Sequence, residues 1–146
     1  MLSENRKFEF LEHQADAYIA AYGKTLEKAF ENAALATFET MTKINRITPK
    51  TKEIVEVEGY DQKALLYNWL EALIVKFDTT QILYNKFSID KIQKTNKGYK
   101  LKATVQGEKY NPKKHPQKVG VKAVTYHRME IKQTPNKTTV KFILDI

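Results

Sequence analysis

The sequence contains no cysteine and only three histidines among its 146 residues. Without thiols the chain cannot form disulfides, thiolate zinc sites, iron–sulfur clusters or a cysteine nucleophile, so its chemistry must use oxygen, imidazole or amine groups. No apolar run approaches the ~18 residues that a membrane-spanning helix needs, and the opening segment MLSENRKFEF lacks the apolar stretch of a secretory signal. These absences predict a soluble, intracellular protein.

Glycine-rich loops are also missing. The chain has 5 glycines, and each stands alone, so it carries neither a phosphate-cradling loop nor a dinucleotide-binding fingerprint. The length fits one domain, 1–146, and hydrophobic residues make up 42% of the chain, enough for a core without help from disulfides.

Positive charge is concentrated in one segment. The formal net charge is +8, and the Lys86–Lys122 segment holds 11 lysines against only Asp90 and Glu108. Clustered positive charge attracts a polyanion or an acidic protein surface, although solvated lysine-rich strands would give the same composition. The segment contains no arginine, the residue favoured for bidentate base readout, which argues against sequence-specific nucleic-acid recognition.

Hydrophobic periodicity predicts two helices and seven strands. Apolar residues recur three and four apart from Leu26 to Met41, after a Thr25 N-cap, and from Leu65 to Phe77, after an Asp61 cap. Period-two alternation predicts strands at Phe8–Leu11, Ala15–Tyr22, Lys50–Glu58, Tyr84–Gln93, Tyr99–Gly107, Val121–Gln133 and Thr138–Ile146. The fold class is therefore α+β and mainly antiparallel. We expect the last four strands to form a meander, with both helices packed on one sheet face.

Carboxylates interrupt the apolar pattern near both ends of the chain. Asp16 shares a strand face with Tyr18, so its carboxylate either projects into a polar pocket or accepts hydrogen bonds in a turn. Asp145 precedes the carboxylate of Ile146, and adjacent hard oxygen groups of like charge favour a cation between them.

The histidines and one lysine are weaker candidates. His127 alternates with apolar residues and is expected to point inward as a buried histidine, whereas Lys122 lies on the opposite face and is either solvated or paired with a carboxylate or phosphate. Glu108 is followed after a loop by His115. No zinc-peptidase spacing joins the histidines. Two histidines and a lysine suffice in principle for general acid–base cleavage of RNA.

Several longer segments, taken together and in order, resemble the archease family over nearly the whole chain. They are FEFLEHQADAYIAAYGKTLEKAFENAALATFETM, LLYNWLEALIVKFDTT, GE with a later loop histidine, VKAVTYHRMEI and FILDI. The resemblance implies a small cytoplasmic protein without enzymatic activity. Such a protein assists the catalytic subunit of the GTP-dependent tRNA-splicing ligase by promoting guanylation of the ligase active-site histidine and its turnover. The lysine-rich strands would contact either an acidic surface of the ligase or the tRNA, and the sequence does not choose between these two partners.

The resemblance also assigns site residues. The metal-binding aspartates of the family correspond to Asp16 and Asp145, its terminal residue to Ile146, and its functional lysine to Lys122. The implied cofactor is a divalent cation, calcium first, with magnesium or manganese as alternatives. Secondary candidates are His13, Glu108 and His127.

One local departure from the family pattern is Gln14, where threonine is usual, and it bears on loop geometry more than on metal binding. The alternative interpretation is an RNA-binding or chaperone-like modulator of another tRNA-processing or tRNA-modifying enzyme. A nuclease acting on its own is a further rival.

Overall fold

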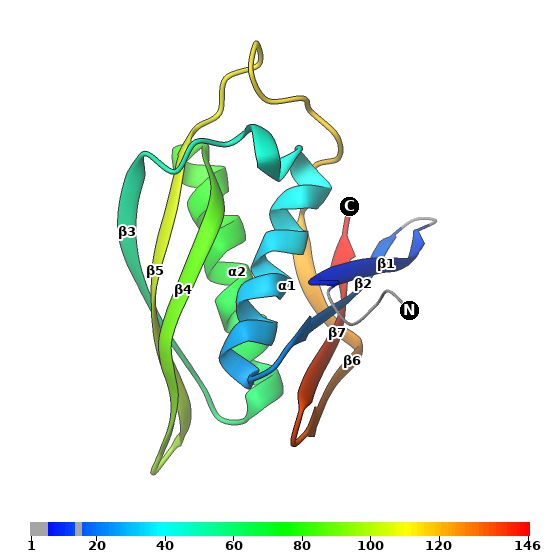
Figure 1. Ribbon diagram of the computed structural model, residues 1–146, viewed down its shortest axis with the longest axis vertical. Helices are drawn as coiled ribbons and strands as arrows, with labels where there is room; N and C mark the ends of the chain where they lie inside the picture. Colours follow the sequence, from blue (N-terminus) through cyan, green and yellow to red (C-terminus); the bar gives the residue numbers. More distant parts are fainter. Residues whose placement is uncertain (1–5, 14–15) are drawn as a thin grey trace.

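The computed structural model, drawn in Figure 1, describes residues 6–13 and 16–146. In these ranges two strands are followed by a helix, a strand, a second helix and four further strands, with a short 3-10 helix after the first helix. The elements are β1 (Phe8–His13), β2 (Asp16–Gly23), α1 (Leu26–Met41), the short 3-10 helix η2 (Ile44–Arg46), β3 (Thr51–Gly59), α2 (Gln62–Thr80), β4 (Ile82–Thr95), β5 (Gly98–Lys109), β6 (Ala123–Thr134) and β7 (Lys137–Asp145). The predicted α+β class is confirmed. Within the described ranges, no helix combines the length and apolar character that crossing a bilayer requires.

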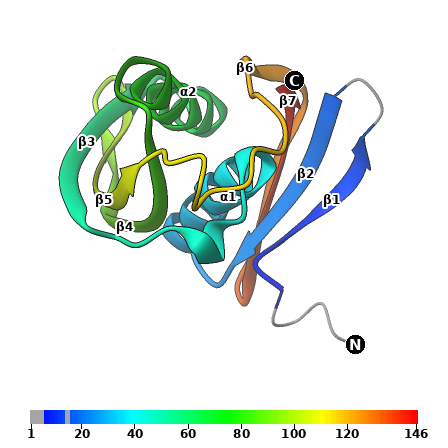
Figure 2. The same ribbon diagram turned by 90° about the horizontal axis from the view of Figure 1, so that it is seen from above.

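The strands form two antiparallel sheets, one ordered β1-β2-β7-β6 and the other β3-β5-β4. Figure 2 shows α1 and α2 between these sheets. The predicted meander of the last four strands is wrong, because β5 and β6 lie in different sheets. The long connection between them crosses from one sheet to the other and allows the helices to bury apolar side chains on both sides.

Both predicted helix caps are present. The side chain of Thr25 accepts a hydrogen bond from the backbone N–H of Lys28 at 3.1 Å, and that of Asp61 accepts one from Ala64 at 2.7 Å. Each cap satisfies a backbone donor that the first turn of a helix leaves without a partner. The helices consequently begin where the sequence indicates.

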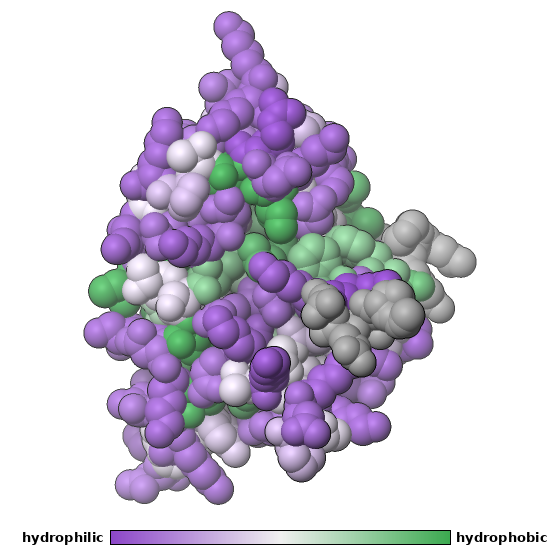
Figure 3. All heavy atoms as spheres, in the orientation of Figure 1, coloured by the Kyte–Doolittle hydropathy of each residue, from purple (hydrophilic) through white to green (hydrophobic). Residues whose placement is uncertain are grey.

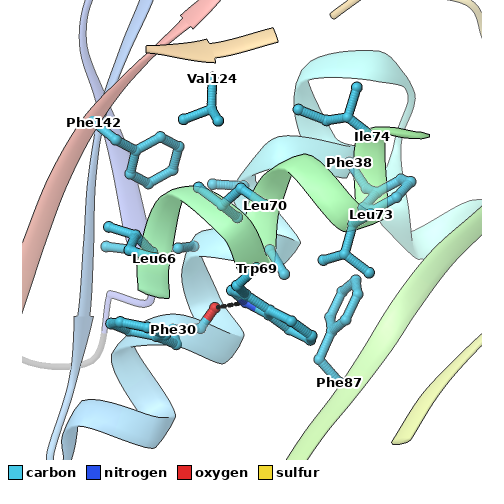
Figure 4. Close-up of a cluster of buried hydrophobic side chains, with 14 of the residues drawn as sticks. Phe30, Phe38, Leu66, Trp69, Leu70, Leu73, Ile74, Phe87, Val124 and Phe142 are labelled. Atoms are coloured by element: carbon cyan, nitrogen blue, oxygen red, sulfur yellow. Dashed lines mark hydrogen bonds between the residues drawn. The ribbon is translucent and has the colours of Figure 1, made fainter. Parts of the chain in front are cut away.

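One hydrophobic core joins the two sheets through the helices (Figure 4). Phe142 contributes from β7 and Phe87 from β4, on opposite sides of the helix pair. Trp69 of α2 is fully buried, and its indole N–H donates to the carbonyl oxygen of Phe30 of α1 at 3.0 Å. Burying each such side chain contributes about 1.5–3 kcal/mol, so this core fixes how the sheets sit relative to each other.

Charged and polar side chains cover most of the outside. Figure 3 shows hydrophilic residues over most of the face seen in Figure 1, with hydrophobic residues gathered mainly across its middle. The exposed large hydrophobic residues include Phe10, Leu11, Tyr60 and Tyr126.

Candidate functional site

Asp16 and Asp145 lie opposite each other in neighbouring antiparallel strands. The β2–β7 register pairs the Cα atoms of Asp16 and Asp145, so their side chains leave the same face of the sheet. Asp16 is exposed and Asp145 is half-buried. Carboxylates from the two ends of the sequence are therefore next to each other at one end of the sheet.

The core determines which face carries these carboxylates. The next pair in the register, Ala17 and Leu144, is buried in the hydrophobic core. Because side chains alternate along a strand, Asp16 and Asp145 occupy the outer face, as Tyr18 does. The expected common face of Asp16 and Tyr18 is thus present.

Lys122 and Ile146 complete this end of the sheet. The backbone N–H of Lys122 donates to the carbonyl oxygen of Asp145 at 2.7 Å, and the Lys122 side chain is exposed. Ile146 is half-buried and packs against the core. We name the group formed by Asp16, Asp145 and Ile146 the acidic tip, with Lys122 beside it.

The donors of the acidic tip suit a hard cation. Carboxylate oxygens are preferred ligands of Ca²⁺, Mg²⁺ and Mn²⁺. In the part of the chain that the structure describes, no three His, Cys, Asp or Glu side chains converge as a metal cluster. Since Ca²⁺ takes about 6–8 oxygen ligands, the tip can fill only part of a coordination shell, and the rest must come from water or from a partner.

His13 ends β1, and its Cα partner in the register is Ala17. The His13 side chain, together with Gln14 and Ala15, lies outside the described residues, so the structure does not place the His13 imidazole relative to the acidic tip.

His127 is exposed, and the prediction that it points inward is wrong. The β6–β7 register shifts between Thr125 and Glu130, and Arg128 adopts a left-handed backbone conformation with φ of 59°. This bulge interrupts the two-residue alternation on which the prediction relied. It also brings the Arg128 guanidinium 4.3 Å from the centroid of the Tyr18 ring, on the outer face that carries the acidic tip.

Glu108, on β5 in the other sheet, is a buried carboxylate at the centre of an ion cluster. Its Oε2 atom lies 2.7 Å from Lys114 Nζ and accepts hydrogen bonds from the Thr48 backbone N–H at 2.9 Å and from His115 Nε2 at 2.8 Å. Burial raises the pKa of Glu108, but the hydrogen bonds from Lys114, Thr48 and His115 outweigh it and lower the pKa to about 2.

His115 has both ring nitrogens engaged. The backbone N–H of Asn111 donates to Nδ1 at 2.9 Å, so the ring hydrogen is on Nε2 and points to Glu108. The ring is only 1% exposed. It therefore anchors the loop after β5 and is not accessible as a general base, which removes one histidine from the predicted RNA-cleaving arrangement.

Comparisons with known proteins match nearly the whole chain to one family. The model of the Archease protein family matches residues 8–146. The archease of Pyrococcus abyssi is 47% identical, covering 90% of this chain and 92% of that protein. The archease of Sulfurisphaera tokodaii is 43% identical, covering 97% and 99%.

Two solved structures share the fold. The solution structure of protein 1598 from Methanobacterium thermoautotrophicum is 40% identical, with a TM-score of 0.83, and the match covers 96% of this chain and 99% of that one. The crystal structure of an archease from Thermotoga maritima is 16% identical, with a TM-score of 0.62 over 94% and 96% of the chains, which supports the fold alone. By its sequence over residues 8–146 and by its fold, the chain belongs to the archease family.

Proposed function

We propose that this protein activates the GTP-dependent tRNA-splicing ligase by promoting guanylation of the ligase active-site histidine and multiple turnover. Membership of the archease family supports the proposal. The observation that supports it is the pairing of Asp16 with Asp145 beside Lys122, the residues to which the family resemblance assigns metal binding and ligase activation. The protein would act as an accessory factor without turnover of its own.

In this proposal the acidic tip holds a divalent cation, calcium first, with magnesium or manganese as alternatives. Asp16 and Asp145 would each contribute a side-chain carboxylate and Ile146 its main-chain carboxylate. The cation would offset the repulsion among these groups and present a charged tip at the surface. Its unfilled coordination positions would face the ligase.

The acidic tip would dock at the ligase active site, with the exposed ammonium group of Lys122 next to it. A partner shifts a conformational equilibrium only through different affinities for the two states, so the tip must bind the guanylation-competent ligase more tightly than the idle enzyme. A tenfold gain in the competent population requires a difference of about 1.4 kcal/mol in binding free energy.

Ligation assays with the cognate ligase test this function. We expect the wild-type protein to speed single-turnover guanylation and to allow multiple turnover, and Asp16→Asn, Asp145→Asn and Lys122→Ala to lose most of the stimulation. The matched controls are Asp78→Asn and Lys132→Ala, which change exposed residues outside the acidic tip. Full stimulation by the tip variants, or ligation and RNA cleavage by the protein alone, would contradict the proposal.

Thermal unfolding tests the cation site without the ligase. Added CaCl₂ should raise the unfolding temperature of the wild-type protein, because a ligand that binds only the folded state stabilises it. The increase should be absent in Asp145→Asn and present in Asp78→Asn. A variant extended by residues after Ile146 separates the main-chain carboxylate from the side chains, and an unchanged calcium response in that variant would remove Ile146 from the ligand set.

A further inference from the structure

We propose that single-stranded RNA binds a second surface, which we name the tyrosine–lysine surface. It consists of Tyr60, Tyr67, Tyr126, Lys63, Lys97 and Lys100. RNA bases would stack on the tyrosine rings, and RNA phosphates would lie against the lysine ammonium groups. The choice of RNA over DNA rests on the proposed function, whereas the surface itself follows from the contacts below.

The aromatic part of the surface is open to solvent. The rings of Tyr67 on α2 and Tyr126 on β6 stack at a centroid distance of 4.4 Å with an interplanar angle of 7°. Tyr126 is nevertheless 48% exposed, and Tyr60 is 76% exposed. Burial raises the pKa of Tyr126, and Tyr60, Asp61 and Tyr67 nearby raise it further, so Tyr60 lies within electrostatic range of the stacked pair. Exposed aromatic faces are what unpaired bases stack on.

A close backbone contact holds the β4–β5 turn against Tyr60. Gly98 has φ of 139°, and a Cβ atom there would lie 2.6 Å from the Cα atom of Tyr60, so the approach requires glycine. Lys97 precedes Gly98 in this turn. Lys100 pairs in register with Glu58, two residues before Tyr60. The turn therefore places Lys97 beside the most exposed tyrosine, and Lys100 follows two residues after Gly98 in β5.

The lysines of this surface are available to a ligand. Lys63 lies one helical turn before Tyr67 and so shares its side of α2. Lys63, Lys97 and Lys100 are exposed, and among the described residues none of the three forms an ion pair within 4.0 Å.

The nearby carboxylates leave a positive balance. They are Glu58, which lies opposite Lys100, Asp61, which accepts a hydrogen bond at the start of α2, and Glu71, one helical turn after Tyr67. Glu56 and Asp90 line the same surface hollow as Lys100, together with Lys91 and Lys102. With Lys63, Lys94 and Lys97 included, six lysines face five carboxylates. A polyanion is attracted by such a balance.

Two other roles of this surface are protection of a sheet edge and binding of an acidic protein, but neither role requires both the lysines and the exposed tyrosines. Lysines on the edge strand β4 would discourage sheet-to-sheet aggregation, but this role does not require stacked and exposed tyrosines. An acidic protein partner would contact the lysines but has no bases to stack on aromatic faces. RNA uses both features. Figure 1 places the β4–β5 turn and the β3–α2 connection at the end away from the C-terminus. Tyr126 lies only four residues after Lys122, so RNA bound along the whole surface would extend from that end toward the acidic tip.

Fluorescence anisotropy with a labelled 12-nucleotide oligouridine tests the proposal, using the full chain without ligase. Tyr60→Leu and Tyr126→Leu should each weaken binding at least about fivefold, since one stacked base contributes on the order of that factor or more. Tyr60→Phe and Tyr126→Phe should bind within about twofold of wild type, because they keep the ring. Replacing Lys63, Lys97 and Lys100 together by serine should weaken binding and flatten its salt dependence.

The matched control is Lys113→Ser, an exposed lysine outside this surface, which should bind RNA as the wild type does. The proposal is overturned if the wild type shows no saturable binding, if the leucine variants bind normally, or if Lys113→Ser weakens binding as much as the triple variant. Equal or tighter binding of oligothymidine would overturn the choice of RNA. Binding is measured without ligase, and ligase stimulation is tested with the acidic-tip variants, so either proposal can fail alone.

Discussion

Replacing Glu108 by glutamine removes one charge from the buried cluster while keeping the shape of the side chain. Glu108 is 6% exposed and contacts Lys114, the Thr48 backbone N–H and His115. The neutral amide leaves the Lys114 ammonium group without its closest counter-charge. We expect the variant to fold but to be less stable at neutral pH, because the neutral amide replaces the charge-assisted contacts that the buried carboxylate makes with Lys114, Thr48 and His115 by weaker ones.

The pKa of Glu108 sets the size and the pH dependence of this effect. The folded pKa is about 2, against an ordinary value of 4.5, so the ionised carboxylate contributes about 3 kcal/mol to stability at pH 7. The folded pKa is lowered, so the contribution is present in full above pH 4.5 and is lost as the pH falls from 4.5 to 2. At pH 2.5 only about 1 kcal/mol remains.

Urea unfolding, monitored by the fluorescence of Trp69, measures the contribution of the Glu108 carboxylate to the free energy of unfolding. Trp69 is a suitable probe because it is the sole tryptophan and is fully buried. The free energy of unfolding of Glu108→Gln should lie about 3 kcal/mol below wild type at pH 7, and the gap should narrow to about 1 kcal/mol at pH 2.5. Glu56→Gln, at an exposed position on β3, should differ little from wild type at either pH. A gap for Glu108→Gln that stays constant between these pH values would refute the reasoning.

Two further variants test local features of the fold. Gly98→Ala should destabilise the protein by about 1–3 kcal/mol in urea unfolding, because φ of 139° suits only glycine and the new methyl group would overlap the carbonyl of Gly59. An unchanged free energy of unfolding would contradict the close backbone contact between Gly98 and Tyr60. Asp61→Ala should cost about 1 kcal/mol through loss of the α2 cap, measured by circular dichroism on heating, and Asp61→Asn should recover most of it.

Elements that depend on local interactions could be predicted from the sequence. Thr25 and Asp61 each cap a helix through a hydrogen bond to a backbone N–H three residues on, which sequence spacing alone reveals. Strands with one buried face alternate visibly, so β5 and β7 fall close to their predicted ranges. These features do not depend on which sheet an element joins.

Features that depend on distant residues could not be predicted this way. The exposure of His127 follows from the bulge at Arg128, and the segment carries no glycine to signal a left-handed residue. The cluster at Glu108 combines side chains and backbone from three segments. Periodicity singled out Asp16 and Asp145, but only the strand order β2-β7 makes them neighbours. Before the structure was considered, only the resemblance to archeases indicated that both aspartates belong to one metal site.

The core explains why Asp16 and Asp145 stay paired although their charges repel each other. A slip of β2 by one residue against β7 would turn every side chain of β2 to the opposite face. Ile19, which is fully buried, would then leave the core, and Asp16 would turn toward Phe142 and Leu144. Each fully buried side chain so exposed would cost about 1.5–3 kcal/mol. Repulsion between like charges opposite each other at a solvent-exposed strand end destabilises the fold by less than that. Burial of the inner face therefore fixes the position of the acidic tip before any cation or partner binds.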